Sequence, residues 1–276
     1  MVEVGSSLRI AIAGSGGRMG QALIAAILAQ SDLTLAAALE IAGSPLLGHD
    51  AGEHCGRATG VAIGADVAAA LREADVLIDF TRPAATVVHA AACAAVGVGV
   101  VVGTTGLSEA DRKALAEAGR AIPLVVAANT SVGVNVLLEL VALAARRLGA
   151  DYDVEIVEMH HRHKVDAPSG TALQLGEAVA SALGRNLGTD GVFAREGITG
   201  ERKPGSIGFA SLRGGDVVGD HTVIFAGPGE RIELAHKAAS RTTFAQGALR
   251  AARFVAARRA ARAPGVYGMQ DVLRLA

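Results

Sequence analysis

Residues 8–20 read Leu8-Arg-Ile-Ala-Ile-Ala13 and then Gly14-Ser-Gly-Gly-Arg-Met-Gly20. The first six residues form a short apolar run that is typical of a buried strand, and the glycines after it allow a tight turn. The order strand, glycine turn, helix predicts a dinucleotide-binding unit, because the backbone N–H groups and the positive dipole end of such a helix attract a pyrophosphate. The helical pattern after the turn is carried by Met19, Leu23, Ile24, Ile27 and Leu28.

The spacing of these glycines is less specific than their context. Gly14 and Gly16 fit the G-x-G-x-x-G pattern only loosely, because residue 19 is methionine. Gly14-x-x-Gly17-x-x-Gly20 describes the turn better, and a generic strand–helix turn is the alternative. The assignment therefore depends on the residues that follow.

An acidic residue stands where a dinucleotide site needs one. Glu40 ends the next predicted strand, residues 33–40, and lies 20 residues after Gly20. At that place a carboxylate can accept hydrogen bonds from the adenosine ribose, and a solvated loop acid is the alternative. Ile41 follows where an arginine would be a natural clamp for a 2′-phosphate. The sequence therefore favours NADH, although Arg18 could still meet a phosphate.

Three more apolar runs in the first half predict strands, and each of them ends in polar residues. Helical patterns lie between the runs. This alternation predicts a parallel, doubly wound sheet, in which ligands lie beyond the carboxyl ends of the strands. The polar ends are therefore candidates for a nicotinamide and ribose wall. The runs are residues 75–80, 98–103 and 122–127, and the polar ends are residues 80–82, 103–105 and 127–130.

The second half predicts a smaller domain of another class. A helix follows Ser131, a strand covers residues 153–160, and three later stretches alternate like antiparallel strands. We expect an α/β protein, with an N-terminal Rossmann-type doubly wound parallel sheet and a smaller α+β domain with a mostly antiparallel, mixed sheet. The expected domains are residues 1–130 with 241–276, and residues 131–240. The three alternating stretches are residues 206–213, 217–226 and 231–236.

The most distinctive stretch is Glu158-Met-His-His-Arg-His-Lys-Val-Asp-Ala-Pro-Ser-Gly-Thr171. A zinc site fits poorly, because no cysteine is near and the spacing is not the i, i+4 pair of a helical zinc motif. Structural histidines at a strand end are a second interpretation. A cationic acid–base pocket is the third, because a histidine whose pKa is near neutrality can donate a proton and Lys164 can offset substrate carboxylates.

The secondary structure expected around this stretch divides it into two parts. Gly170 and Thr171 lie at the start of a predicted helix, which is a natural site for an anionic carboxylate. If the preceding strand stays extended through His161, then His160 and His161 point to opposite faces. A dianionic substrate would suit this arrangement.

Composition and charge exclude several classes of protein. A length of 276 residues suggests two domains, and a formal net charge of −1 argues against a nucleic-acid binder that relies on a strong field. No apolar run reaches the ~18 uncharged residues of a membrane span. The N-terminus lacks a secretory pattern, so we expect a cytoplasmic protein. Cys55 and Cys93 have no C-x-x-C partner, so we expect neither a disulfide nor a metal site.

The run from His160 to Ala172 resembles the signature of the 4-hydroxy-tetrahydrodipicolinate reductase (dihydrodipicolinate reductase) family, which serves the bacterial lysine and diaminopimelate pathway. The resemblance covers essentially the whole chain, and the histidine–lysine run is very specific, whereas the glycine turn is not. The other matching stretches are Gly14 to Gly20, Asp79-Phe-Thr-Arg-Pro83, Gly103-Thr-Thr105, Ala127-Ala-Asn-Thr-Ser131, Arg195-Glu-Gly, Gly205 to Gly219 and Asp271-Val-Leu.

The resemblance implies a reaction and the residues that perform it. His160 is the implied proton donor and Lys164 a second donor or electrostatic partner, while His161, Gly170 and Thr171 bind the carboxylates of a dicarboxylate substrate. Hydride passes from NADH or NADPH to C4 of a cyclic imine, with loss of the hydroxyl as water. The family is a homotetramer whose substrate-domain sheets join. With the polar strand ends, the expected cofactor-binding residues are Gly14, Ser15, Gly16, Gly17, Arg18, Met19, Glu40, Phe80, Arg82, Gly103, Thr104, Thr105, Ala127, Ala128, Asn129 and Thr130.

Two residues depart from the family pattern. Thr130 replaces a phenylalanine, and Ile41 replaces an arginine seen in members that accept NADPH well.

Two rival functions are open to the sequence. The enzyme rival is another two-domain dehydrogenase of the aspartate or homoserine type, which the uninterrupted run from His160 to Thr171 disfavours. The other rival is a redox-sensing regulator, which would need a basic DNA-binding element that the sequence lacks.

Overall fold

The protein is described by a computed structural model that covers residues 7–275. The chain forms two compact units. The first contains the residues up to Val132 together with those from Arg241 onward, and the second contains Gly133–Ser240. The second unit is therefore an insertion between two parts of the first.

The first unit is built on a parallel sheet of seven strands in the order β12-β6-β5-β4-β1-β2-β3. The strand order reverses at β1, which has β2 on one side and β4 on the other. In sheets of this kind the crevice for a ligand lies at such a switch point, beyond the carboxyl ends of the strands. The strands are β1 (Leu8–Ala13), β2 (Leu33–Leu39), β3 (Ile63–Gly64), β4 (Val76–Asp79), β5 (Gly99–Val102), β6 (Pro123–Val126) and β12 (Gly265–Tyr267).

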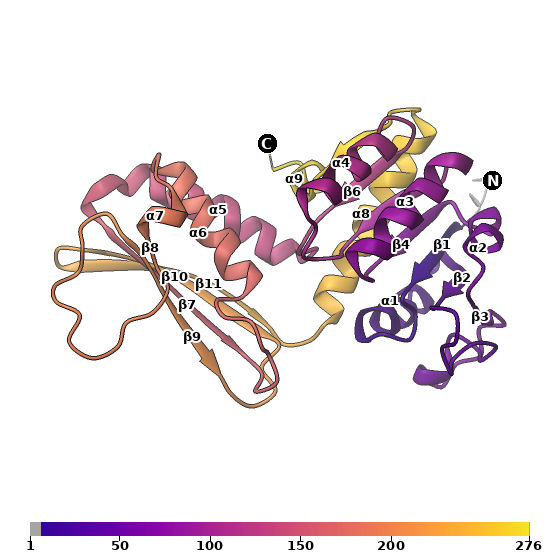
Figure 1. The fold of residues 1–276 in the computed structure, drawn as a ribbon, viewed down its shortest axis with the longest axis horizontal. Helices are drawn as coiled ribbons and strands as arrows, with labels where there is room; N and C mark the ends of the chain where they lie inside the picture. Colours follow the sequence, from indigo (N-terminus) through magenta and orange to yellow (C-terminus); the bar gives the residue numbers. More distant parts are fainter. Residues whose placement is uncertain (1–6, 276) are drawn as a thin grey trace. The chain divides into compact units, whose positions relative to one another are not determined.

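Helices cover both faces of this sheet, which confirms the doubly wound fold expected from the sequence (Figure 1). Two clusters of buried hydrophobic residues, one on each face, hold the layers together. On one face lie α1 (Arg18–Leu28), α8 (Thr242–Ala260) and α9 (Met269–Leu273), and on the other lie α2 (Val67–Glu73), α3 (Pro83–Val96) and α4 (Glu109–Ala118).

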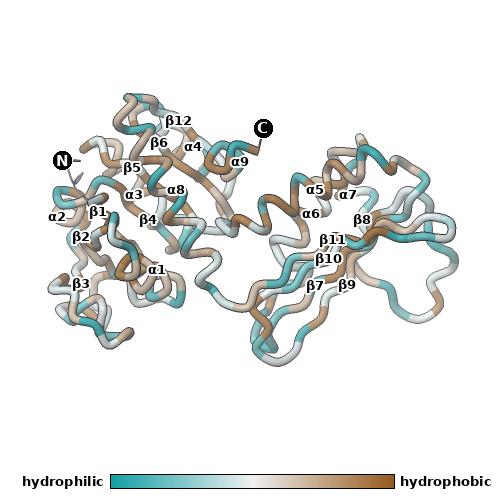
Figure 2. Tube along the Cα trace, turned by 180° about the vertical axis from the view of Figure 1, so that it is seen from behind, coloured by the Kyte–Doolittle hydropathy of each residue, from teal (hydrophilic) through white to brown (hydrophobic). Residues whose placement is uncertain are grey.

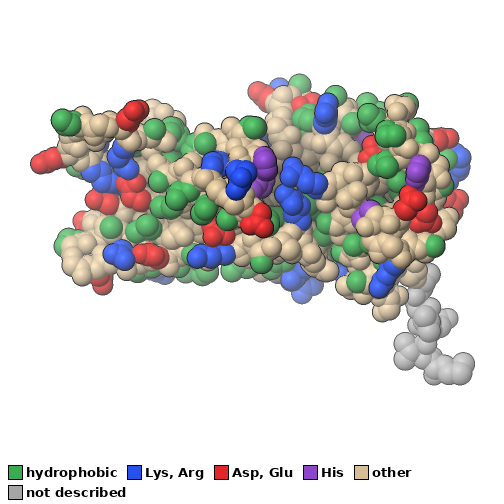
Figure 3. All heavy atoms as spheres, turned by 90° about the horizontal axis from the view of Figure 1, so that it is seen from below, with side chains coloured by type: hydrophobic (Ala, Val, Ile, Leu, Met, Phe, Trp, Pro, Cys, Tyr) green, Lys and Arg blue, Asp and Glu red, His purple; other side chains and the backbone are tan. Residues whose placement is uncertain are grey.

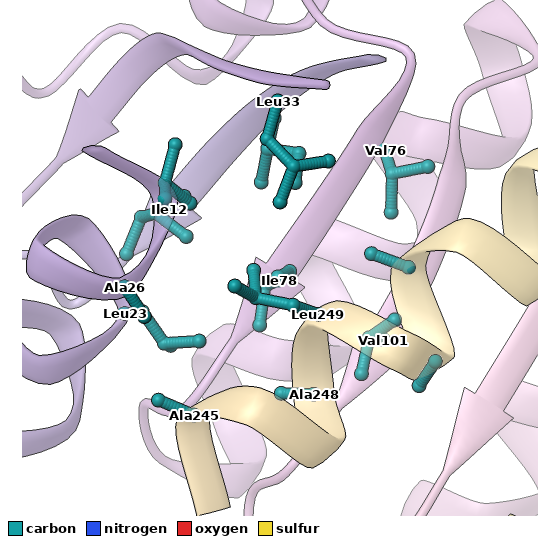
Figure 4. Packing of buried hydrophobic residues seen from close by; sticks show 14 of the residues in the cluster. Ile12, Leu23, Ala26, Leu33, Val76, Ile78, Val101, Ala245, Ala248 and Leu249 are labelled. Carbon is teal, nitrogen blue, oxygen red and sulfur yellow. The ribbon is translucent and has the colours of Figure 1, made fainter. Parts of the chain in front are cut away.

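The helix α8 closes one face of the sheet although it comes late in the chain. Its residues Ala245, Ala248 and Leu249 are fully buried. Small alanine side chains let the helix lie close to the strands, and Figure 4 shows Leu249 next to Ile78 of β4 and Val101 of β5. Burial of each such leucine or isoleucine stabilises the fold by about 2 kcal/mol.

The second unit contains a mixed five-stranded sheet in the order β11-β10-β7-β9-β8. The pairs β11–β10 and β10–β7 are antiparallel, whereas β7–β9 and β8–β9 are parallel. The prediction of an antiparallel strand at residues 206–213 was therefore wrong, because the chain crosses through α6 between β7 and β9, and such a crossover returns the chain in the parallel direction. The strands are β7 (Asp153–His160), β8 (Gly191–Val192), β9 (Ile207–Arg213), β10 (Gly219–Gly227) and β11 (Glu230–Ala238).

One face of the second sheet is covered by helices, and α5 is largely hydrophobic along its length (Figure 2). Leu137 and Val141 of α5 and Leu175 of α6 pack on Ile156 and Phe225 of the sheet. The other face is left without a helix in the described part of the chain, and hydrophobic side chains lie there among charged ones (Figure 3). The helices are α5 (Val132–Leu148), α6 (Gly170–Ala182) and α7 (Leu187–Asp190), and two short 3₁₀ turns are η1 (Glu53–Cys55) and η2 (Gly149–Asp151).

None of the described helices is long and apolar enough to cross a membrane.

Candidate active site

The glycine turn of the first unit closes over the end of β2. Gly14 has φ +76°, a conformation that glycine adopts without strain. The backbone N–H groups of Gly14 and Ser15 both donate to the Leu39 carbonyl, over 2.9 and 3.0 Å. The Gly17 N–H donates to the Gly14 carbonyl over 3.1 Å. The turn is therefore fixed by backbone contacts between β1, β2 and the start of α1.

Two further glycines permit close approaches at this turn. A Cβ atom on Gly20 would lie 2.1 Å from the Gly14 carbonyl oxygen, so α1 packs against the turn only because residue 20 has no side chain. A Cβ atom on Gly16 would lie 2.2 Å from Leu46 Cδ1. The Gly16 N–H donates to Glu40 Oε1 over 2.8 Å. This hydrogen bond joins the turn to the carboxylate that is predicted to bind the adenosine ribose.

Two cavities lie at this edge of the sheet, one of about 350 Å³ and one of about 570 Å³. Phe80 and Thr81, at the end of β4, line both of them. The smaller cavity is also lined by Met19, Gly103, Thr104, Thr105, Ala128, Asn129, Thr130 and Phe244. The larger cavity is also lined by Gly14, Gly17, Leu39, Glu40, Ile41, Ala42, Ala65, Val67, Arg82, Ala85 and His89.

Most of the cofactor-binding residues expected from the sequence thus line one of two adjacent cavities. Ser15, Gly16, Arg18 and Ala127 line neither. Ser15 is buried, and no hydrogen-bond partner reaches its hydroxyl within the described residues. An unsatisfied hydroxyl in a glycine turn, beside a carboxylate and two cavities, fits the pyrophosphate and ribose of a nicotinamide dinucleotide.

Thr130 has a structural contact that the sequence did not suggest. Its hydroxyl donates to the Phe244 carbonyl in the first turn of α8 over 2.7 Å, and its side chain is buried. A Cβ atom on Gly247 would lie 1.7 Å from the Thr130 carbonyl oxygen. Thr130 therefore ties the segment after β6 to α8, and Phe244 joins Phe80 as an aromatic side chain in the lining of the smaller cavity.

A buried polar network lies next to the two cavities. The sequence did not predict it. The Asp79 carboxylate is completely buried. It accepts hydrogen bonds from the Thr81 hydroxyl over 2.6 Å and from the Thr81 N–H over 2.8 Å, and it contacts His89 Nδ1 over 2.8 Å. The Thr86 and Thr104 hydroxyls lie 2.7 Å apart beside it. Asp79 lies within the predicted strand of residues 75–80, but nothing in the pattern showed that His89 would reach it.

In the second unit the predicted proton donor lies at the end of β7. His160 is 9% exposed, and its Nδ1 lies 2.6 Å from Glu158 Oε2. Because a carboxylate only accepts hydrogen bonds, Nδ1 carries the hydrogen and Nε2 is left for another partner. A Cβ atom on Gly219 would lie 3.0 Å from Nε2, so a side chain at position 219 would crowd this nitrogen.

Glu158 is held as an anion by its neighbours. Its carboxylate receives both arms of the Arg213 guanidinium, with N···O distances of 2.8 Å each, and the Ser169 N–H over 3.2 Å. Burial alone would raise the pKa of Glu158, but hydrogen bonds from Arg213, His160 and Ser211 outweigh it and lower the pKa to about 2. Burial is also the largest influence on His160, whose pKa lies below its ordinary value.

Lys164 lies near His160, and His161 lies just after the end of β7. The Lys164 ammonium donates to both oxygens of Asp166, over 2.8 and 2.9 Å. Its charge is one of those that lower the pKa of His160. Since β7 ends at His160, the strand alternation does not extend to His161, whose ring lies 6.2 Å from that of His163.

The predicted anion-binding end of the site is the start of α6. Gly170 and Thr171 are its first two residues, and the Ser169 hydroxyl caps the helix by accepting from the Ala172 N–H over 3.2 Å. The same hydroxyl lies 3.0 Å from His221 Nε2. Burial in the first place, and then the charge of His160, lowers the pKa of His221 to about 4, so this ring is neutral near pH 7.

Sequence reasoning missed Glu158, Arg213 and His221 as parts of this site. Glu158 could have been found, because residues two apart in a strand share a face, so it accompanies His160. Arg213 and His221 come from β9 and β10, where the register with β7 decides the contact. Within residues 7–275, no group of three or more His, Cys, Asp or Glu side chains is placed to hold a metal ion.

A parallel sheet with a glycine turn at its switch point, joined to a unit with a buried histidine–carboxylate pair, is the arrangement expected of a two-domain nicotinamide-dependent reductase. Comparison with known proteins then narrows the class. The family model "Dihydrodipicolinate reductase, N-terminus" matches residues 8–130, and "Dihydrodipicolinate reductase, C-terminus" matches residues 133–273. The chain belongs to the dihydrodipicolinate reductase family.

Curated relatives agree with the family models. The 4-hydroxy-tetrahydrodipicolinate reductase of Cupriavidus taiwanensis is 59% identical over 268 residues, which cover 97% of this chain and 100% of the relative. That of Laribacter hongkongensis is 58% identical over 270 residues, covering 98% and 99%. The chain is an NAD(P)H-dependent oxidoreductase that reduces 4-hydroxy-tetrahydrodipicolinate to tetrahydrodipicolinate, a step of lysine and diaminopimelate biosynthesis, as the resemblance in the sequence implied.

Solved structures show the same fold. A dipicolinate-bound dihydrodipicolinate reductase from Paenisporosarcina sp. TG-14 has a TM-score of 0.73 at 24% identity, covering 96% of this chain and 99% of the other. An amine dehydrogenase from Mycobacterium smegmatis has a TM-score of 0.57 at 16% identity, covering 92% and 93%. At these identities the likeness concerns the fold alone, which is shared by dehydrogenases of different substrates.

Proposed function

We propose that in this chain His160 donates the proton that the reduction consumes, and that the first unit binds the nicotinamide cofactor while the second binds the substrate. The observation that carries the proposal is the 2.6 Å contact of His160 Nδ1 with the buried Glu158, which leaves Nε2 beside Gly219 for the substrate. The bound cofactor supplies one hydride. Loss of the substrate hydroxyl as water requires one proton, which a protonated His160 can give from Nε2.

The substrate carboxylates are assigned to the cationic and helix-end groups of the second unit. Gly170 and Thr171 begin α6, whose N-terminal N–H groups and dipole favour an anion. His161 lies directly after β7, on the same connection as Lys164. Lys164 is neutralised by Asp166, and a substrate carboxylate would compete for its ammonium. Lys164 is thus a second donor or an electrostatic partner in this proposal.

We infer a preference for NADH over NADPH. Ile41 lines the larger cavity next to Glu40 and is 74% exposed, so an aliphatic side chain stands where a 2′-phosphate would need a cation. The Glu40 carboxylate would also repel that phosphate. Arg18 lies at the start of α1, close enough to lower the pKa of Arg241, after burial as the larger cause. These two arginines offer positive charge near the turn. That charge would serve the pyrophosphate, which NADH and NADPH share, as well as a 2′-phosphate.

A homotetramer joined through the second unit is part of the same proposal. The sheet face opposite α5 and α6 carries partly exposed hydrophobic side chains such as Val157 and Ile224, and Leu212 is 45% exposed on β9. Joining such faces would bury them. The mass of the particle in solution, measured by light scattering, tests this: a monomer at micromolar concentration would contradict it.

The test of the site compares three variants within the run from His160 to Lys164. His160→Ala and Lys164→Ala should each lower kcat by about 100-fold or more while the KM for NADH stays within twofold, because they serve the chemistry and not the cofactor. His163→Ala, from the same run but with no assigned role, is the matched control and should keep most of its turnover. The measurement is a coupled assay with freshly generated substrate and both cofactors. Near-normal kcat in the first two variants would overturn the assignment.

A further inference from the structure

We propose that Glu158 and Arg213 are positioning residues that act through His160: Glu158 holds the ring in one orientation and tautomer, and Arg213 limits how strongly Glu158 retains the ring's proton. The proposal goes beyond the assignment of His160 as proton donor and rests on it. The two residues lie on neighbouring strands, and Arg213 is the direct register partner of His160.

The contacts of Glu158 determine which nitrogen of His160 faces the substrate. Glu158 is 1% exposed, and its Oε2 takes the Nδ1 hydrogen of His160 at 2.6 Å. Its Oε1 accepts from the Ser169 N–H over 3.2 Å, which links the carboxylate to the start of α6. Both oxygens are thus engaged on the protein side. The ring can rotate only by breaking a buried charge-assisted hydrogen bond, so Nε2 stays directed to the side of Gly219, where a side chain would crowd it.

The contacts of Arg213 place a fixed positive charge behind this carboxylate. Its two terminal nitrogens bind Glu158 in a fork, one nitrogen to each oxygen at 2.8 Å. The same two nitrogens donate to the Leu212 and Asp166 carbonyls, each over 2.6 Å. A guanidinium held in this way cannot swing away from Glu158. Without it, a bare buried carboxylate would hold the imidazolium tightly and oppose release of its proton.

Opposite charges surround His160, and their balance sets how readily it gives up its proton. Glu158 on β7 favours the imidazolium, whereas Lys164 on the next loop and Arg213 on β9 disfavour it. Asp166 pairs with Lys164, and His221 on β10 packs its ring edge-on at 5.1 Å. Removing Glu158 and removing Arg213 should therefore move the titration of His160 in opposite directions. A purely structural role for the pair predicts no such opposition.

The same strand carries a matched pair that lacks a histidine. On the opposite face of β7, Arg195 binds Glu155 in the same fork, with two N···O distances of 2.8 Å, and Arg202 Nε also donates to Glu155 over 3.0 Å. Residues 155 and 158 are an odd number of positions apart, so they point to opposite faces. Substitutions in this pair change charge and stability on β7 without touching His160, which makes them the control.

The experiment records kcat/KM against pH for Glu158→Gln, Arg213→Met, Glu155→Gln and Arg195→Met in the full-length enzyme. Activity that needs a protonated donor falls as pH rises through the pKa of His160. Glu158→Gln should move this fall to lower pH, and Arg213→Met to higher pH, each by about one unit, with kcat reduced about tenfold or more. The KM for NADH should stay unchanged in both. The Glu155 and Arg195 variants should keep the wild-type profile.

A second measurement keeps the two proposals separate. Nitrogen-15 NMR of the histidine rings reports tautomer and titration without turnover. In the wild type the neutral His160 should carry its hydrogen on Nδ1. Glu158→Gln, whose amide can either accept or donate, should weaken this preference and titrate lower, and Arg213→Met should titrate higher. Shifts in the same direction, or none, overturn the positioning role. If the NMR shifts appear but His160→Ala keeps full turnover, the positioning stands and the assignment of the proton donor fails.

Discussion

In the first unit, the ligand edge is made from backbone: residues 14–20 are consecutive, and their N–H groups bond to the carbonyls of Leu39 and Gly14. In the second unit, the cluster around His160 is made from side chains that meet across strands, and Glu158 and Arg213 lie 55 positions apart. The first construction is sensitive to added volume at its glycines. The second depends on charges and on the register of β7 with β9 and β10.

The largest expected effect tests the backbone construction. Gly20→Ala adds a Cβ atom 2.1 Å from the Gly14 carbonyl oxygen and 2.7 Å from Ser15 Cα, so the backbone of the turn must move. We expect a loss of about 3 kcal/mol in the free energy of unfolding and a rise of about tenfold or more in the KM for NADH. Urea unfolding and steady-state kinetics measure both. The pH dependence of kcat/KM should stay that of the wild type.

Gly64→Ala is the control for this prediction. Gly64 ends β3 in the same sheet, and a Cβ atom there would have nothing within 4 Å. We expect the KM for NADH to stay within twofold of the wild type. An equal rise in both variants would mean that the clash at Gly20 is not the cause.

The second prediction concerns the loss of stability of the second unit's side-chain cluster as the pH falls. Burial lowers the pKa of His221 from 6.5 to about 4, so between these values the unfolded chain binds a proton that the folded chain does not. The stabilising contribution of the neutral His221 is therefore fully present above pH 6.5 and is lost as the pH falls towards 4. From pH 7 to pH 5 the contribution of this residue to the loss is about 2 kcal/mol.

Comparison with His221→Asn isolates that contribution. His160 and His236 also have lowered pKa values and act in the same direction, so the wild type loses more than His221 alone explains. Glu158 titrates lower and does not act in this range. Urea unfolding at pH 7 and pH 5 should show a drop that is about 2 kcal/mol smaller in the variant. Equal drops would show that His221 titrates normally.

The smallest expected effect compares two helix caps. Ser169 caps α6 in the second unit and Ser108 caps α4 in the first, each by accepting from a backbone N–H over 3.2 Å. Ser169→Ala and Ser108→Ala should each cost about 1 kcal/mol of stability. Only Ser169→Ala should also raise the KM for the dicarboxylate substrate, by several-fold, because it loosens the start of α6. An equal KM in both variants would remove α6 from the substrate site.

The parts of the molecule that were predictable from sequence are those whose signals are local. The strand over residues 8–13, its glycine turn and the polar ends of β4, β5 and β6 follow from short patterns, and the structure brings them to one edge. The direction of β9 was not predictable from its alternation, because a period of two is the same in parallel and antiparallel strands. The crossover between β7 and β9, which contains α6, α7 and β8, sets that direction.

The network around His160 lay beyond sequence reasoning for a similar reason. The run from His160 to Thr171 indicated an acid–base pocket, and the alternation within β7 places Glu158 on the same face. The register that sets Arg213 against His160, and His221 against Glu158, is a tertiary property. So is the burial that keeps His221 neutral.

The position of α8 in the chain has a consequence for synthesis on the ribosome. Its buried residues, from Ala245 to Val255, cover β4, β5 and β6. Translation reaches them only after all of Gly133–Ser240 has been made. A nascent chain that ends before α8 exposes one apolar face of the parallel sheet, whereas the inserted unit already has its own core. The first unit can therefore be completed only after the second unit has been synthesised. During that interval its apolar strands are open to a chaperone that binds such surfaces.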